Sequence, residues 1–160
     1  MLNWKALEYL LAQLEGAPNL YESLVSMATD EELDYRPDPE RFTIREAISH
    51  VADWEPIFAE RLEIILTVEN GTLQGYDESE IARTGKYGER SVPEQIRLIA
   101  ERRRKLVARI KGLSPEDWDR SAEHTEIGHV VTTDLVVLIA AHDAYHLRQI
   151  AEWRRLYELQ

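Results

Sequence analysis

The sequence contains no cysteine among its 160 residues. This absence excludes disulfides, thiolate metal ligands and a cysteine nucleophile, so any thiol chemistry must use the sulfur of a substrate. Phosphate-binding motifs are also missing, since neither GxGxxG nor GxxxxGK[ST] occurs, and the GxSxG motif of serine esterases is absent. Nucleotide binding and serine hydrolysis are therefore not expected.

Long apolar runs and a surplus of basic residues are lacking too. The longest apolar run, 135–141, is about a third of the roughly 20 residues that cross a bilayer. Residues 1–16 lack the charged and apolar regions of a signal peptide, so we expect a cytoplasmic protein without a membrane partner. Nineteen basic against 30 acidic residues give a formal charge of −11, which argues against nucleic acid as a partner.

Helical periodicity dominates the chain, whose length fits one domain, 1–160. The connections of about 15 to 20 residues exceed those that join antiparallel neighbours in simple bundles. We therefore predict an all-α four-helix bundle with long crossover connections, and capped segments at 29–33 and 114–118 predict two short helical turns. The predicted long helices, of which the first two contain Pro18 and Pro56 and should bend there, cover 4–25, 43–69, 91–112 and 133–157.

One connecting segment and one basic helix are further candidates for a functional role. Residues 71–90 hold four of the seven glycines, which predicts a mobile crossover that could cover a site. Residues 91–112 carry five Arg and two Lys against two Glu, so an anion-binding face from Arg97 to Lys111 is one hypothesis. Because Arg102, Arg103 and Arg104 fan over some 200° of the helix, we instead predict a solvated basic face.

Two histidines lie one helical turn apart in the last helix. His142 and His146 fall on its apolar seam, where an unpaired polar group costs about 1 to 3 kcal/mol. A metal ion bound by both rings would satisfy them, and hydrogen bonds within the core are the alternative. A metal site needs a third ligand, for which the remaining histidines are candidates. We choose the helical His50 over His124 and His129, which fall in a predicted loop of extended character, because a helix fixes a ligand more tightly.

Two further side chains are candidates for contacts around such a site. Asp53 lies one turn after His50, and a carboxylate that accepts a ligand imidazole N–H fixes its tautomer. The alternative for Asp53 is an exposed helix residue. Gln149, one turn beyond His146, could contact a ligand or satisfy the core.

Two segments of the chain resemble the DinB-like (YfiT-like) metalloproteins. They are 36–53, with Arg36-Pro37, Phe42 to Glu46 and His50 to Asp53, and 142–150. Their order and helical placement extend the likeness over essentially the full chain, although Phe42 stands where the family often has Trp and Arg148 where a small residue is frequent. The resemblance implies a four-helix bundle, a homodimer, and a divalent metal ion bound by His50, His142 and His146.

Three imidazole ligands would leave one coordination position open, as catalytic zinc sites do. An ion such as Zn, Ni or Fe could then lower the pKa of a bound water or thiol. The family includes S-transferases and an isomerase that use low-molecular-weight thiols, so the leading hypothesis is a metal-dependent transferase activating a small thiol or water. The alternatives are a noncatalytic stress-related or dimerisation module with a structural metal, and a thiol-dependent isomerase or metal-dependent hydrolase.

Overall fold

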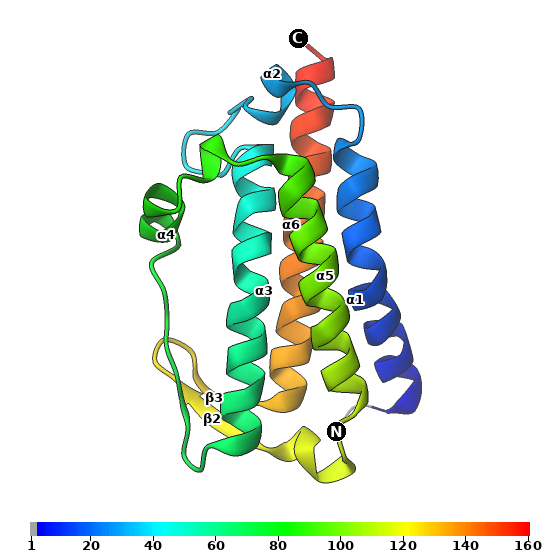
Figure 1. Cartoon of the computed structure of the whole chain (residues 1–160), viewed down its shortest axis with the longest axis vertical. Coiled ribbons are helices and arrows are strands. Elements are labelled where there is room, and N and C mark those ends of the chain that lie inside the picture. The colour runs from blue at the N-terminus through cyan, green and yellow to red at the C-terminus, as the bar shows by residue number, and fades with distance from the viewer. Residues whose placement is uncertain (1–2) are drawn as a thin grey trace.

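The computed structural model describes residues 3–160, so residues 1 and 2 of the predicted domain lie outside the described part. Four long helices run side by side in an elongated bundle (Figure 1). Their bounds follow the predicted helices closely, and the predicted all-α four-helix bundle is confirmed. The long helices are α1 Trp4–Val25, α3 Ile44–Thr67, α5 Val92–Lys111 and α6 Thr132–Glu158.

The order of the helices around the bundle differs from the order in the sequence. Helix α1 packs against α5 and α6, and α3 also packs against α5 and α6. Consecutive long helices in each half of the chain are therefore diagonal to each other. This arrangement requires the long crossover connections that the sequence predicts. It also brings α3 and α6, which carry the candidate histidines, into direct contact.

The connections contain more regular structure than the sequence indicates. The two predicted turns are α2 Asp30–Leu33 and the 3-10 helix η2 Pro115–Asp119. Residues 71–90, predicted as a mobile crossover, form β1 Thr72–Leu73, the short helix α4 Glu78–Thr84 and the 3-10 turn η1 Tyr87–Glu89. The strand β1 pairs in parallel with β2 Ser121–His124, which pairs antiparallel with β3 Gly128–Val131. Strands of two to four residues are too short to show an alternating pattern.

Two of the long helices continue through a proline. Pro18 lies inside α1 and Pro56 inside α3. A proline has no N–H, so the carbonyl four residues earlier loses its partner in the helix. The two carbonyls concerned are those of Leu14 and Ala52. A helix that continues through a proline needs other donors for these oxygens.

Two adjacent arginines of α5 supply the missing donors. Arg103 Nη1 donates to the Leu14 carbonyl at 3.2 Å, and Arg102 Nη1 donates to the Ala52 carbonyl at 2.6 Å. Each bond joins α5 to the backbone of a neighbouring helix. The two prolines and the two arginines therefore form matched pairs that tie α1 and α3 to α5.

Arg103 is buried, and the prediction of a solvated face is wrong for it. Its side chain is the largest among the fully buried ones, with 1 % of the residue exposed. Besides Leu14 it donates to both carboxylate oxygens of Glu55 and of Asp143, the latter at 2.5 and 3.1 Å. All five N–H groups of the guanidinium are thereby used. The Tyr21 hydroxyl donates to Asp143 at 3.1 Å, so this buried network joins all four long helices.

The buried network divides the hydrophobic core into two clusters. One cluster contains Leu106 and Ala140 and the other contains Ile99 and Ile150. On α5 the break between the clusters includes Arg103, and on α6 it includes Asp143. The buried ion pairs of Arg103 thus lie where the two apolar clusters meet.

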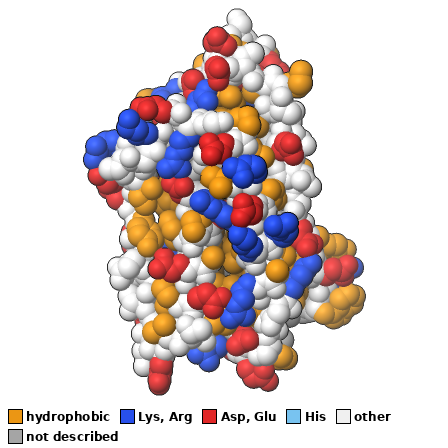
Figure 2. Space-filling view, in the orientation of Figure 1, with side chains coloured by type: hydrophobic (Ala, Val, Ile, Leu, Met, Phe, Trp, Pro, Cys, Tyr) orange, Lys and Arg blue, Asp and Glu red, His pale blue; other side chains and the backbone are white. Residues whose placement is uncertain are grey.

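The outer face of α5 carries mixed charge, and Figure 2 shows blue and red side chains interspersed along it. Several of its cations pair with carboxylates. These pairs are Arg109 with Glu63, Lys105 with Glu101 and Lys111 with Glu15. None of the helices in the described residues is long and apolar enough to span a membrane.

Candidate metal centre

Three histidine side chains converge between α3 and α6. His50 comes from α3, and His142 and His146 come from α6, one turn apart. One ring nitrogen from each lies within 4.8 Å of the others, and the Nε2 atoms of His50 and His142 are 2.9 Å apart. His50 and His146 are buried, with 1 % and 4 % of the residue exposed, while His142 is partly buried. The structure therefore brings together the three histidines that the sequence selects.

Gln149 orients His146. The Gln149 amide nitrogen donates to the Phe42 carbonyl at 2.7 Å, which leaves its oxygen facing His146 Nδ1 at 3.2 Å. An amide oxygen only accepts, so Nδ1 carries the proton and Nε2 of the neutral ring keeps its lone pair. The contact predicted for Gln149 is present, and it leaves Nε2 of His146 available as a ligand.

Aromatic rings surround the histidines. The indole of Trp54 lies against His50 with 4.2 Å between ring centroids, and Phe58 packs edge-on to His142 at 5.4 Å. Tyr145 lies perpendicular to His146 at 5.0 Å. These rings pack against the three imidazoles, and among residues 3–160 none of them makes a hydrogen bond to a histidine of the cluster.

Asp53 does not have the predicted role. Its carboxylate accepts from Arg90 Nη1 at 2.9 Å, and no hydrogen bond joins it to any of the three histidines in the described residues. His50 Nδ1 is buried without a hydrogen-bond partner in the same residues. The physical reason is competition, because the guanidinium of Arg90 is a permanent cation and takes the carboxylate instead.

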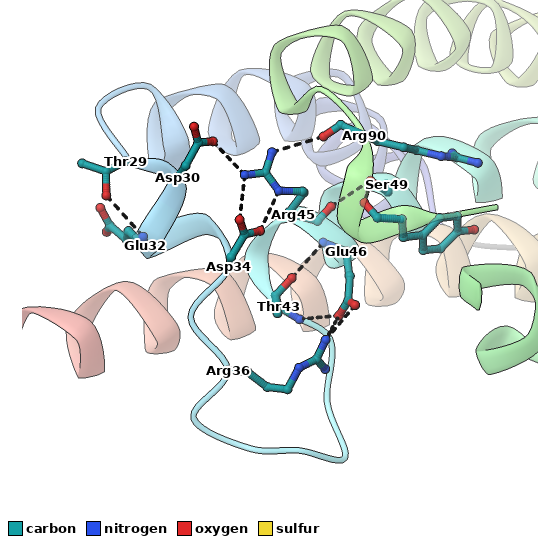
Figure 3. A network of polar contacts seen from close by, with 11 residues as sticks. Thr29, Asp30, Glu32, Asp34, Arg36, Thr43, Arg45, Glu46, Ser49 and Arg90 are labelled. Carbon is teal, nitrogen blue, oxygen red and sulfur yellow. Dashed lines mark hydrogen bonds and ion pairs between the residues drawn. The ribbon is translucent and has the colours of Figure 1, made fainter. Parts of the chain in front are cut away.

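The Asp53 ion pair helps to anchor the crossover 71–90 on α3. Arg45 Nη1 donates to the Arg90 carbonyl at 3.2 Å, and the Ser49 hydroxyl donates to the Tyr87 carbonyl at 3.3 Å. Figure 3 shows Arg45 at the centre of this network, where its guanidinium also donates to Asp30 and Asp34. The end of the crossover is thereby fixed beside the histidines.

Burial keeps the three imidazoles neutral. It lowers the pKa of His50 to about 3, with a smaller contribution from His146, and it lowers the pKa of His146 to about 4. The pKa of His142 is also lowered, first by burial and then by the two neighbouring rings and Arg103. Neutral imidazoles are the form that binds a metal ion.

The same pKa shifts make the metal-free protein sensitive to acid. Unfolding exposes each imidazole, which then takes up a proton below its ordinary pKa of 6.5, whereas the folded form does so only near 3 to 4. The unfolded state therefore binds more protons, and the free energy of unfolding should fall as pH decreases below 6.5. For each of His50 and His146 we expect a slope approaching about 1.4 kcal/mol per pH unit.

Urea unfolding of the metal-free protein between pH 7 and pH 5 measures this slope. The His146→Ala variant should show a shallower dependence on pH than the unmodified protein, by about the contribution of one histidine. Equal slopes for the two proteins would contradict the assignment.

The other two histidines lie outside the cluster. The ring nitrogen Nδ1 of His124, in β2, accepts from the backbone N–H of Glu126 at 3.1 Å. His129, in β3, is exposed and lies 3.0 Å from Glu123. Both belong to the small sheet, and neither joins the three clustered rings.

A pocket of about 480 Å³ opens beside the three histidines. The crossover contributes Glu78 and Ser79 to its wall, so the predicted covering segment does border the site. Sequence reasoning missed Glu40, Arg41 and Tyr145. Their only signal in the sequence is that they lie beside residues of the family-like segments. Glu40 and Arg41 come just before Phe42, and Tyr145 comes just before His146. The remaining lining residues are Phe42, Leu138, Ala141, Gln149 and the histidines.

Comparison with known proteins agrees with this geometry. Residues 13–150 match the DinB superfamily. A protein of Oceanobacillus iheyensis called "Putative metal-dependent hydrolase" is 29% identical over 140 residues, which are 86% of this chain and 80% of that protein. A protein of Bacillus pumilus with the same description is 27% identical over 147 residues, covering 91% of this chain and 83% of the relative.

Two solved structures share the fold. YfiT from Bacillus subtilis, described as "a probable metal-dependent hydrolase with an unusual four-helix bundle topology", superposes with a TM-score of 0.93 at 20% identity, covering 99% of this chain and 91% of YfiT. A mycothiol-dependent maleylpyruvate isomerase superposes with a TM-score of 0.72 at 14% identity, covering 94% of this chain and 63% of the isomerase. With the superfamily matching most of its length, this chain belongs to the DinB superfamily.

Proposed function

We propose that His50, His142 and His146 bind a divalent metal ion, and that the protein is an enzyme that activates a low-molecular-weight thiol for transfer to an electrophile. The observation that carries this proposal is three neutral ring nitrogens gathered beside a pocket of about 480 Å³. Neutral nitrogen donors suit Zn, Ni and Fe.

The chemistry of the donor set fits a metal ion. Burial removes the protons that would compete for the imidazoles, and Gln149 leaves the lone pair on Nε2 of His146. The Nε2 atoms of His50 and His142 lie 2.9 Å apart, so two potential metal ligands face each other. When bound, a divalent ion lowers the pKa of a thiol or water beside it and so supplies a nucleophile at neutral pH.

The surroundings favour a catalytic site over a structural one. Structural zinc sites are usually closed by four protein ligands, whereas catalytic sites keep a position for substrate. The three histidines form the only group suited to hold a metal in residues 3–160. Their side of the bundle opens into a pocket whose wall contains carboxylate, guanidinium, phenol and apolar groups. A metal that only joined two helices would have no need of this space.

Thiol and water are the two candidate nucleophiles. The absence of cysteine means that a thiol must come from a substrate, and the fold is shared with an isomerase named for its dependence on mycothiol. Water is supported by a different observation, namely that the relatives in Oceanobacillus and Bacillus are called metal-dependent hydrolases. Hydrolysis is therefore the second candidate function.

One panel of reactions tests both candidates. Protein loaded with Zn, Ni or Fe is offered small thiols with an aryl halide or epoxide, and separately offered activated esters and amides without thiol. We expect thiol-dependent turnover that His146→Ala lowers by roughly 100-fold or more, because the variant loses a ligand of the site. Turnover of esters alone would favour hydrolysis. Equal rates for both proteins in every reaction would count against catalysis.

A further inference from the structure

Arg41 lies in the wall of the metal-site pocket with part of its guanidinium unused. Its Nη1 atom pairs with Glu152 at 3.3 Å. One flat face lies 4.3 Å from the centre of the Trp153 ring, and the Tyr145 ring lies at 5.9 Å. The side chain is thus held by stacking and by one long ion pair. It also contributes to the lowered pKa of His146, which places its charge near the centre.

Two further nitrogen atoms of the Arg41 guanidinium have no hydrogen-bond partner within residues 3–160. Nε and Nη2 are buried, and neither has a hydrogen-bond partner in the described residues. Together they make up one edge of the guanidinium, with two N–H groups that point in nearly parallel directions. This edge matches the two oxygens of a carboxylate. Leaving such donors without partners costs about 1 to 3 kcal/mol or more, which a bound anion would recover.

The backbone that carries Arg41 is fixed before any ligand binds. The Arg41 carbonyl accepts from Arg36 Nη1 at 2.9 Å, and the next carbonyl, that of Phe42, accepts from Gln149 and from Trp153 Nε1. In Figure 3 Arg36 reaches from the loop to Glu46 at the start of α3. Gln149 also orients His146, so one amide positions both the loop and a candidate metal ligand.

We propose that the Nε–Nη2 edge of Arg41 binds the carboxylate of a small-molecule substrate whose reacting end lies at the three-histidine centre. The statement about the reacting end rests on the proposed function, whereas the carboxylate site does not. A carboxylate fits better than a phosphate dianion because Glu40 and Glu78 line the same pocket and repel a second negative charge. The pair with Glu152 is an easily broken one, since that carboxylate is 39% exposed.

The test compares pairs of thiols that differ in one group. Protein loaded with Co(II) is titrated with two acids, mercaptoacetate and 3-mercaptopropionate, and with the matching alcohols, 2-mercaptoethanol and 3-mercaptopropanol. The absorption band of a cobalt-bound thiolate reports binding without any turnover. We expect at least one acid to bind about 10-fold more tightly than its alcohol, the ratio that one charge-assisted bidentate contact supplies. Arg41→Gln should abolish this ratio and leave the affinity for the alcohols unchanged, and Arg41→Lys should restore little of it.

Arg148→Gln is the matched control. The guanidinium of Arg148 lies 5.7 Å from the same Tyr145 ring but does not line the pocket, so this variant should keep the preference for acids. Circular dichroism checks that all variants are folded. A preference that survives Arg41→Gln, or that Arg148→Gln removes equally, would overturn the proposal.

A second arm separates this proposal from the thiol chemistry. If no thiol gives the absorption band, thiol activation fails, and calorimetry with propionate, butyrate and inorganic phosphate then tests the anion site alone. Carboxylate binding that Arg41→Gln eliminates would still support the site. Binding of phosphate in preference to the carboxylates, or binding that is independent of Arg41, would overturn it.

Discussion

Replacing Arg103 with methionine should lower the free energy of unfolding by about 3 to 5 kcal/mol, the usual cost of removing one partner from a buried ion pair. Methionine fills a similar volume but leaves Glu55 and Asp143 buried without their cation. It also leaves the Leu14 carbonyl without a donor, because Pro18 cannot supply one. Urea unfolding at pH 7, followed by circular dichroism, measures the change.

The neighbouring residue provides a control for this experiment. Arg104 is exposed, so Arg104→Met should change stability by no more than about 0.5 kcal/mol. Adding Glu55→Gln and Asp143→Asn to Arg103→Met removes the two uncompensated charges and should recover part of the loss. If Arg103→Met and Arg104→Met were equally stable, the buried network would have no net role in stability.

Replacing His142 with alanine should remove stoichiometric metal binding. Each ligand of a metal site contributes a few kcal/mol, so we expect affinity to fall by roughly 100-fold or more. Elemental analysis of protein purified without an affinity tag, followed by competition with a chelator, measures both the content and the affinity. The folded structure should persist, because His142 is only partly buried and lines the pocket.

Substitutions at the other two histidines and at Gln149 should affect metal binding to different degrees. His124→Ala and His129→Ala should leave metal content unchanged, since both rings belong to the small sheet. Gln149→Leu should lower affinity by about 10- to 100-fold, as loss of a hydrogen bond to a ligand ring does. Similar losses in His129→Ala and His142→Ala would show that the metal is bound elsewhere.

The sequence predicts best the features that depend on the spacing of residues close to one another in the chain. The long helices follow apolar spacing and capping residues, such as Thr43 with Glu46, both of whose reciprocal bonds are present. The pairing of His142 with His146 follows from helical geometry. The firm support that a helix gives a ligand favours His50 over the other histidines, and the structure places it beside His142 and His146.

The features that sequence reasoning missed depend on contacts between distant residues. Arg103 reads as one cation among several on a polar helix, and only the packing of four helices shows that it is enclosed by carboxylates. Asp53 sits at the right helical spacing to serve His50, yet Arg90 from the crossover takes its carboxylate. The only local signal for Arg41 is its position before Phe42, because its place in the pocket wall results from the fold of the 34–43 loop.

The matched prolines and arginines make the two halves of the chain depend on each other. A fragment that ended before α5 would keep Pro18 and Pro56 but lack the donors for the oxygens of Leu14 and Ala52. The complementary fragment would retain the guanidinium of Arg103 without Glu55 or Leu14. The two halves of the chain are thus not autonomous folding units, and neither one should acquire its native shape until the other is present.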